Sequence, residues 1–235
     1  MSPRQRRALI VDALKTVIPD VVHGVCKISE RDVRRAPAAA RPKLAELTGW
    51  SVVVYAVPIT DEGLWVWHRH GDRRSLMANY VLALGFDAAC SAMRETGEEI
   101  LSVSEHTGNG VSMVELGELA GLGTRGWNNL LLHPTYGSWL QIEALATPGE
   151  LEEDPISAYP EDVCVKCMAC ITDCPADALS VDDFNAAACS KLVAAPWNPR
   201  SEAVALTERS YLECRECIDS CPVGSPPERI FSWRH

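Results

Sequence analysis

Apolar residues in the first two thirds of the chain recur at the spacings of helices and strands. Residues 52–57 form an unbroken apolar run ended by Pro58, which predicts a buried strand. Apolar positions within 9–18 follow a helical period and predict an amphipathic core helix. Residues 76–84 predict a second helix, with Gly85 as its C-terminal cap. This mixture of elements indicates an α/β domain.

Weaker patterns extend the same domain. Residues 100–103 are typical of a short strand, and residues 114–120 are typical of a helix that runs into a glycine cluster. Residues 130–132 and 139–145 predict two further strands, one on each side of a turn at 134–137.

A change of composition marks the end of this domain. Residues 147–150 and 152–155 are acidic and rich in turn-forming residues, so we expect a linker and a boundary near residue 158. Residues 159–235 show little periodicity but many cysteines and prolines. A segment of this kind has a small apolar core and depends on bound metal for stability. The sequence therefore predicts two domains, 1–158 and 159–235.

The net charge of the chain limits the classes of partner that we expect. The 235 residues are 47% hydrophobic and carry a formal net charge of −10. Proteins bind phosphate backbones through clustered Lys and Arg. The charge therefore argues against a nucleic-acid-binding surface, and we expect no DNA partner.

The N-terminal region bears on location. No apolar stretch approaches the roughly 20 residues that a membrane helix needs. Arg6 and Arg7 suggest a twin-arginine export signal, but Asp12, Lys15 and Asp20 interrupt what would be its apolar core. We therefore expect a cytoplasmic protein without a membrane partner.

The cysteines are distributed unevenly. Cys26 and Cys90 stand alone, and we expect both to be structural thiols in the core. The other eight of the ten cysteines fall between Cys164 and Cys221. Disulfides are rare in the cytosol, so this cluster of cysteines indicates metal chemistry in a reducing or anaerobic compartment.

The spacing of these cysteines is that of a two-cluster ferredoxin. The first run places three cysteines at intervals of three, followed by a fourth and a proline: Cys164, Cys167, Cys170, Cys174 and Pro175. In such a run three thiolates surround one [4Fe–4S] cluster while the fourth ligates the other cluster. The second run lacks one cysteine of the full pattern: Cys214, Cys217, Cys221 and Pro222. Cys189 lies between the runs and fills the vacancy.

These eight thiolates divide into two ligand sets. The crossed pattern assigns the first cluster to Cys164, Cys167, Cys170 and Cys221. It assigns the second cluster to Cys174, Cys189, Cys214 and Cys217. Two structural zinc sites or a disulfide scaffold are the alternatives. Zinc ribbons use two Cys-x2-Cys pairs rather than a run of four cysteines that ends in Cys-Pro, so we favour iron–sulfur clusters.

A glycine cluster lies upstream of the cysteines. Gly121, Gly123 and Gly126 fit the dinucleotide fingerprint G-x-G-x-x-G. That fingerprint should follow a strand and open a helix, whereas a helical pattern precedes this cluster and Pro134 follows it closely. We therefore expect no nucleotide-binding Rossmann fold.

Several motifs occur in a fixed order around this cluster. Residues 120–123 are followed by Leu-Leu-Leu-His-Pro at 130–134, Tyr-Gly at 136–137, Thr147 and Asp-Pro at 154–155, and then by the two cysteine runs. This order resembles the corrinoid iron–sulfur family of reductive dehalogenases and epoxyqueuosine reductases. Residues 52–58 and 84–88 resemble further family segments, so the resemblance covers roughly residues 50 to 225.

The resemblance implies a fold and a cofactor. It implies an α+β protein in which a nitroreductase-like domain precedes a ferredoxin-like domain with two [4Fe–4S] clusters. The first domain would hold a base-off cobalamin, to which the clusters pass electrons, and the cofactor would carry out the chemistry. Glycines lack Cβ and let a flat macrocycle lie close to the backbone. The expected corrin contacts are Thr107, Gly108, Asn109, Gly110, Gly121, Leu122 and Gly123.

This chain departs from the pattern of epoxyqueuosine reductases in two places. Epoxyqueuosine reductases carry an acidic residue just upstream of the glycine cluster, where this chain has His106, Thr107 and Gly108. Many of them also have a C-terminal extension for tRNA, and this sequence ends soon after its last cysteine. Together with the negative charge, these differences predict that tRNA is not a partner.

Several residues are candidates for the proton donor. Reductive dehalogenases use a Tyr near a basic residue, so the resemblance makes Tyr80 a catalytic candidate. His106 is the second candidate, because it borders the glycine loop that begins at Thr107. Tyr80 fits a core position equally well, and its rivals His68 and His70 fit a solvated polar stretch. We expect the nearby tryptophans to belong to the core: Trp65, Trp67 and Trp127.

Three functional hypotheses remain. The first is a cobalamin-dependent reductase of a small organic substrate, served by a low-potential donor such as a ferredoxin or a flavodoxin. The second is an electron carrier or corrinoid reductase that passes electrons to a partner. The third is an epoxyqueuosine reductase. A domain ahead of the clusters favours the first over a bare ferredoxin, and a count of bound cobalt separates the first from the second.

Overall fold

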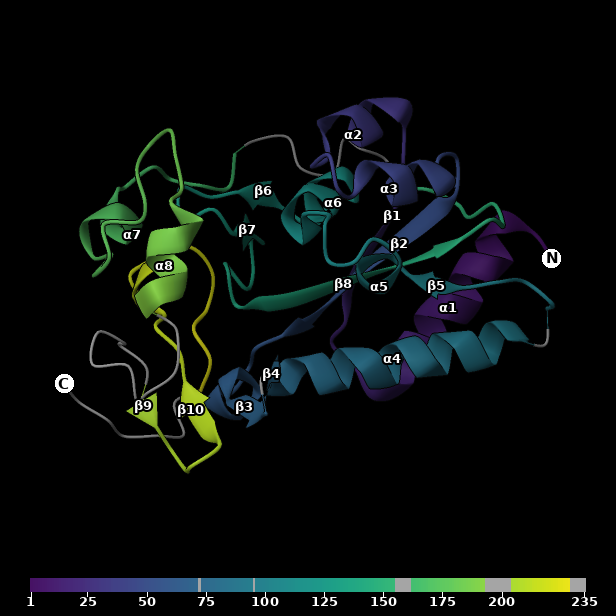
Figure 1. Cartoon of the computed structure of the whole chain (residues 1–235). Coiled ribbons are helices and arrows are strands. Elements are labelled where there is room, and N and C mark those ends of the chain that lie inside the picture. The colour runs from purple at the N-terminus through teal and green to yellow at the C-terminus, as the bar shows by residue number, and fades with distance from the viewer. Residues whose placement is uncertain (72, 95, 155–161, 193–203, 229–235) are drawn as a thin grey trace. The chain divides into compact units, whose positions relative to one another are not determined.

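The computed structural model describes residues 1–71, 73–94, 96–154, 162–192 and 204–228. Its packing divides the chain into two compact units, and each unit is assembled from three stretches of sequence. Figure 1 labels the elements of both. The stretches of the first unit are 1–58, 81–124 and 141–161. The stretches of the second unit are 59–80, 125–140 and 162–235.

A four-stranded sheet with the order β1-β2-β8-β5 lies at the centre of the first unit. Its strands are β1 (Val22–Lys27), β2 (Ser51–Pro58), β8 (Leu140–Thr147) and β5 (Leu101–Ser102). β1 runs antiparallel to β2, with Val25 opposite Val53. Every residue of β2 is buried, which confirms the strand predicted from the apolar run.

Helices accompany this sheet. They are α1 (Pro3–Val17), α2 (Glu30–Arg35), α3 (Arg41–Glu46), α4 (Met77–Arg94), α5 (Val103–His106) and α6 (Met113–Leu119). Of these, α5 and α6 contact the strands of the sheet. α1 begins with a capping box, in which Ser2 and Gln5 satisfy each other's backbone N–H groups. It buries Ile10 and Leu14, as the helical period predicts.

The glycine at position 85 does not end a helix, so the prediction of a C-terminal cap was wrong. α4 runs through Gly85 for about two and a half further turns, to Arg94. A Cβ at Gly85 would lie 3.1 Å from Ile18 Cδ1 and 3.3 Å from Leu14 Cδ2. The missing side chain therefore lets α4 pack closely on α1 (Figure 1), at a position where glycine costs the helix roughly 1 kcal/mol.

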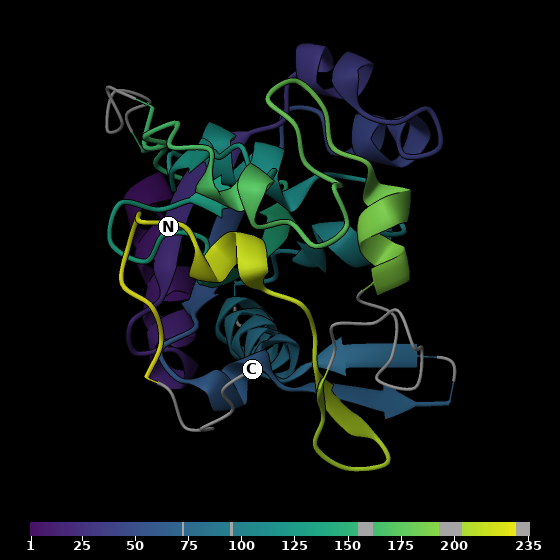
Figure 2. The ribbon, with the colours of Figure 1, turned by 90° about the vertical axis from the view of Figure 1, so that its left-hand side faces the viewer.

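The second unit contains its own four-stranded sheet, with the order β4-β3-β10-β9. The strands are β4 (Arg73–Leu76), β3 (Trp67–His70), β10 (Ser210–Leu212) and β9 (Val204–Ala205). His68 lies opposite Ser210 in the antiparallel pair of β3 and β10, and Figure 2 shows the yellow β10 beside the blue strands. The sequence analysis treated residues 68–70 as a polar stretch and missed this hairpin.

The remaining elements of the chain are short. They are η1 (Glu62–Trp65), β6 (Thr124–Arg125), β7 (Leu131–Leu132), α7 (Ala169–Thr172), α8 (Ala186–Leu192) and α9 (Glu216–Asp219). β7 and β8 correspond to the strands expected at 130–132 and 139–145. The strand expected at 100–103 is reduced to β5, because α5 begins at Val103.

The predicted boundary near residue 158 falls within 155–161, outside the described residues, and stays a prediction. The packing adds that residues 59–80 and 125–140 group with the cysteine-rich segment. Among the described residues, no helix has the length and apolarity needed to cross a membrane.

Candidate metal centre

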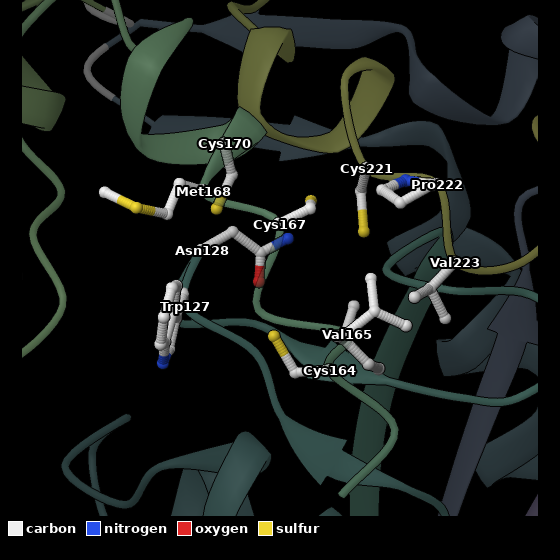
Figure 3. Close-up of a pocket in the computed structure, with 11 residues that line it drawn as sticks. Trp127, Asn128, Cys164, Val165, Cys167, Met168, Cys170, Cys221, Pro222 and Val223 are labelled. Carbon is white, nitrogen blue, oxygen red and sulfur yellow. The ribbon is translucent and has the colours of Figure 1, made fainter.

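The first predicted ligand set surrounds one pocket. Cys164, Cys167 and Cys170 come from the loop before α7 and from α7 itself, and Cys221 follows α9. Figure 3 shows the four side chains around this pocket, together with Asn128. Four cysteines separated by up to 57 positions in the sequence are therefore neighbours in space.

The backbone between these cysteines is sharply bent. Lys166 has a φ of 55° and Met168 a φ of 65°, both in the left-handed region that non-glycine residues seldom adopt. Each such residue turns the chain, so that the short spacings bring three cysteines to one side. An ion pair of 3.1 Å between Lys166 Nζ and Asp162 Oδ2 spans the first of these turns.

The second predicted ligand set lines a separate pocket. Cys174 and Cys214 lie in loops, Cys189 comes from α8 and Cys217 comes from α9. The Ala178 N–H donates a hydrogen bond of 3.3 Å to Cys174 Sγ. Apolar side chains form most of the remaining wall: Leu130, Pro175, Ala176, Leu179, Phe184 and Ile218.

These two groups are the crossed sets that the spacing predicts, in which Cys221 joins the first run and Cys174 joins the second. Their ligation of clusters stays a prediction. No three His, Cys, Asp or Glu side chains among the described residues are arranged to hold a single metal ion.

Burial raises the pKa of thiols in both sets, Cys170 and Cys221 in the first among them, and its largest effects fall in the second set. It raises the pKa of Cys217 to about 12 and that of Cys214 to about 11. Burial also raises the pKa of Cys189 in the same pocket. These side chains are therefore neutral thiols at neutral pH in the absence of metal. Metal ligands must be deprotonated, so cluster assembly at this pocket releases protons.

Asn128 belongs to the walls of both pockets. Its side chain is buried, and its Nδ2 donates to Ser138 Oγ at 2.8 Å and to the Cys217 carbonyl at 3.5 Å. Its Oδ1 accepts from the Leu130 N–H at 3.2 Å. The side chain therefore joins the segment before β7 to the backbone of a predicted ligand.

Two ion pairs flank the second set, and the pair between Glu62 and Arg215 is buried. Glu213 lines the pocket and is paired with Arg74, and burial raises the pKa of Glu213 to about 7 against the opposing effect of Arg74. Glu62 is fully buried and lies 2.5 Å from Arg215, which also binds Asp219 at 2.8 Å. Arg215 follows Cys214 directly, so this network fixes the backbone of the second cysteine run.

The sequence analysis missed the side chains that complete the pockets. Asn128, Glu213 and Glu62 are ordinary polar residues by sequence, and no spacing connects them to the cysteines. Trp65 and Trp127 were expected in the core, but Trp65 lines the second pocket and Trp127 lines the first. The tryptophan-rich stretch around residue 65 was the one sequence signal that could have pointed to these pocket walls. Its polar residues did not suggest a strand, so the stretch was not placed next to the cysteines.

The loop at 107–110 is described within the first unit. Thr107 is buried and its Oγ1 donates to the Val103 carbonyl at 2.7 Å. Gly108 has a φ of 63° and no atom within 4 Å of a Cβ position, so a ligand has room beside its backbone. A Cβ at Gly110 would lie only 2.6 Å from Ala40 Cβ, so Gly110 serves local packing. Asn109 also adopts a positive φ, of 57°.

The glycine cluster forms the C-terminal cap of α6. Gly121 has a φ of 72° and ends α6, with the Leu122 N–H donating to the Gly117 carbonyl at 2.8 Å. This is the arrangement of a Schellman cap. Leu122 and Gly123 are buried. The cluster follows a helix, as expected when the Rossmann fold was set aside, and its corrin contacts stay a prediction.

The catalytic candidates lie in different units. Tyr80 is 43% exposed, so it is not a core residue, and its hydroxyl lies 3.1 Å from His70 Nε2. His106 ends α5, and its Nε2 lies 3.2 Å from Glu46 Oε2. His68 is not simply solvated, because its Nδ1 lies 3.0 Å from Ser210 Oγ. The roles of Tyr80 and His106 stay predictions.

Known proteins resemble this chain in the same regions. A family described as a 4Fe-4S binding domain matches residues 161–177 and 212–224, which hold seven of the eight clustered cysteines. The epoxyqueuosine reductase of Listeria monocytogenes serovar 1/2a is 30% identical over 108 residues. That match covers 46% of this chain and 24% of the relative, so the chain spans about a quarter of the relative's length.

Solved structures share the fold. An epoxyqueuosine reductase with a tRNA-Tyr epoxyqueuosine-modified stem loop has a TM-score of 0.58 at 18% identity, over 80% of this chain and 57% of that one. A reductive dehalogenase, whose structure suggests a mechanism for B12-dependent dehalogenation, has a TM-score of 0.63 at 18% identity. It is matched over 94% of this chain and 32% of that one.

The chain therefore resembles the family that its motifs indicated, whose named members are oxidoreductases. It has a mixed α/β fold with a ferredoxin-like 4Fe-4S segment. The expectation that tRNA is not a partner was wrong: the curated relative is an epoxyqueuosine reductase, and a solved relative binds a tRNA stem loop. Net charge sums over every surface, whereas RNA binding depends on local surfaces, so the charge of −10 did not justify the exclusion.

Proposed function

We propose that this chain is an iron–sulfur reductase of the epoxyqueuosine reductase type, in which two [4Fe–4S] clusters supply electrons to a cobalamin. The observation that carries the proposal is the pair of pockets, each lined by four cysteines in the crossed arrangement of a two-cluster ferredoxin. We further propose that the first unit is nitroreductase-like and binds the cobalamin.

The protein's part in this function is to hold and insulate the clusters. The second set lies among apolar side chains and is fixed by the Glu62–Arg215–Asp219 network. Asn128 belongs to both pockets, which supports a short path between the two clusters. An outside donor delivers single electrons, and two clusters together can supply the pair that an epoxide reduction consumes.

The cobalamin has weaker support from the chain. When bound, it would supply the cobalt centre at which the substrate is reduced. The open space beside Gly108 fits a flat ligand lying against the backbone, and Gly108 is the expected contact that this geometry supports best. The packed position of Gly110 and the capping role of Gly121 give those glycines reasons of their own.

We propose epoxyqueuosine in tRNA as the first substrate to test, because the curated relative is named for this reaction. One observation favours a second candidate, an electron carrier that serves a partner's corrinoid. The positions nearest to the family's acidic residue upstream of the glycine cluster are His106, Thr107 and Gly108 here. Thr107 is buried, and its hydroxyl donates to the backbone. A cobalt count separates the two candidates.

The test is anaerobic reconstitution of the full chain with iron, sulfide and hydroxocobalamin, followed by desalting and metal analysis. About eight irons and one cobalt per chain are expected. About eight irons without cobalt would favour the electron-carrier hypothesis over the reductase hypothesis, and fewer than about four irons would refute both hypotheses. The loaded protein is then incubated with a low-potential reductant and epoxyqueuosine-containing tRNA, and conversion is followed by nucleoside mass spectrometry. No conversion by a cobalt-loaded chain would exclude this substrate.

A further inference from the structure

One indole beside the second cysteine set lacks a partner. Trp65 lines the pocket of Cys174, Cys189, Cys214 and Cys217. Its Nε1 is buried and has no hydrogen-bond acceptor among the described residues. An indole nitrogen can only donate, and a buried donor left unpaired costs about 1–3 kcal/mol. Trp65 therefore lines this pocket and carries a buried donor that has no acceptor among the described residues.

The ring of Trp65 is held in place. It packs edge-on against Trp139 at a centroid distance of 5.6 Å and an interplanar angle of 74°. Trp139 is 3% exposed, and the Arg215 guanidinium lies 5.6 Å from its ring centroid. Arg215 is in turn held by Glu62, which belongs to the same short helix as Trp65. The indole is thus fixed by groups that also fix the second cysteine run.

A cluster in this pocket would provide the missing acceptor. Its sulfides and thiolates carry negative charge, and hydrogen bonds to these sulfurs are one of the terms that set a cluster's reduction potential. The Ala178 N–H already donates to Cys174 Sγ, so the pocket holds one N–H···S bond without the indole. The first pocket differs in this respect. Trp127 is the tryptophan that lines it among the described residues, and Trp127 Nε1 is not a buried donor without a partner.

We propose that Trp65 Nε1–H donates a hydrogen bond to a sulfur of the cluster held by the second cysteine set and raises that cluster's reduction potential. The inference rests on the proposed function, since it needs the clusters. Reduction adds one electron and negative charge to the cluster, and the donor stabilises that charge while its proton stays on nitrogen. Trp65 is a tuning residue that acts through the cluster.

The chain provides a matched control two residues further on. Trp67 Nε1 is also buried and unpaired, but Trp67 is not part of either pocket wall as described. Its ring lies under the Arg74 guanidinium, 5.1 Å from the centroid. Trp67→Phe therefore removes the same atom as Trp65→Phe without removing a donor from a cluster.

The experiment compares reconstituted wild type, Trp65→Phe and Trp67→Phe in anaerobic redox titrations followed by EPR. Equal iron contents are required first. We expect Trp65→Phe to shift the midpoint of one cluster to more negative potential, leaving the other unchanged, and Trp67→Phe to shift neither. Cys189→Ala identifies which signal belongs to the second cluster. Unchanged midpoints in Trp65→Phe would overturn the inference, and water would then be the partner of the indole.

A measurement on the wild type covers the case in which Trp65→Phe loses a cluster. Protein labelled with [indole-15N]tryptophan should show a 15N hyperfine coupling on the reduced second cluster in ENDOR spectra. Absence of that coupling would refute the hydrogen bond. A wild-type chain that binds no iron would refute the proposed function instead, so the two failures are distinguishable.

Discussion

Cys189 offers the sharpest test of the cluster assignment, because it lies outside both matched stretches of the 4Fe-4S family. Its thiol is half-buried in the second pocket with Cys174, Cys214 and Cys217. Two pockets with four cysteines each predict about eight irons, of which the second pocket holds about four. Cys189→Ala should therefore lower the iron content to about four, or to about seven if a three-iron cluster remains on three thiolates.

The assay is iron and sulfide analysis with EPR of the dithionite-reduced protein after anaerobic reconstitution. Cys90→Ala is the control, because Cys90 is a half-buried thiol on α4 and lines neither pocket as described. The control should keep the full iron content and both EPR signals. If Cys189→Ala matches this control in iron content and spectrum, Cys189 is not a ligand and the eight-thiolate reasoning fails.

Further predictions concern the framework around the site. Glu62→Gln should destabilise the second unit by about 3 kcal/mol. This is the lower end of the range for a broken buried ion pair, because Arg215 keeps its second partner, Asp219, at 2.8 Å. Anaerobic urea unfolding followed by cluster absorbance measures the change, and an unchanged unfolding midpoint would show that the Glu62–Arg215 pair does not stabilise the unit. Gly24→Ala should destabilise the first unit by about 1–3 kcal/mol, because the new Cβ would lie 2.0 Å from the Ala120 carbonyl oxygen. Thermal unfolding followed by circular dichroism measures this loss of stability. A variant as stable as the wild type would show that β1 can shift to make room for the Cβ. Burial raises the pKa of Cys26 to about 12, so the folded chain keeps this proton where an unfolded chain loses it, and stability should fall as the pH rises above 9. Alkylation of native Cys26 at about pH 9 should accordingly be far slower than that of free cysteine, and mass spectrometry showing equal rates would mean that the thiol is accessible.

Local patterns in the sequence were sufficient for part of the fold. The apolar run at 52–57 identifies β2 because a strand buried on both faces needs no alternation. The cysteine spacing groups the eight thiols as the two pockets do, because a short loop can only reach a few positions in space. The order of motifs indicated the family that the comparisons support.

These local patterns could not predict contacts between segments that are distant in the sequence. β3 is polar, and its strand conformation depends on pairing with β4 and β10. Gly85 is a helix-capping residue by propensity, but packing against Ile18 and Leu14 decides its place inside α4. Trp65 and Asn128 reach the cysteines from stretches about 110 and 36 positions before Cys174 and Cys164, and no local signal predicts such meetings.

The pairing of β3 with β10 also constrains the biogenesis of the protein. His68 meets a residue 142 positions later in the chain, so residues 59–80 leave the ribosome well before the strand that completes their sheet. Loop closure over this separation must precede completion of the second unit, and such non-local topologies fold slowly. Under the proposed function, cluster assembly has to follow the synthesis of β10 and Cys221. An excised segment 159–235 would lack Trp65 and Asn128, which line its pockets.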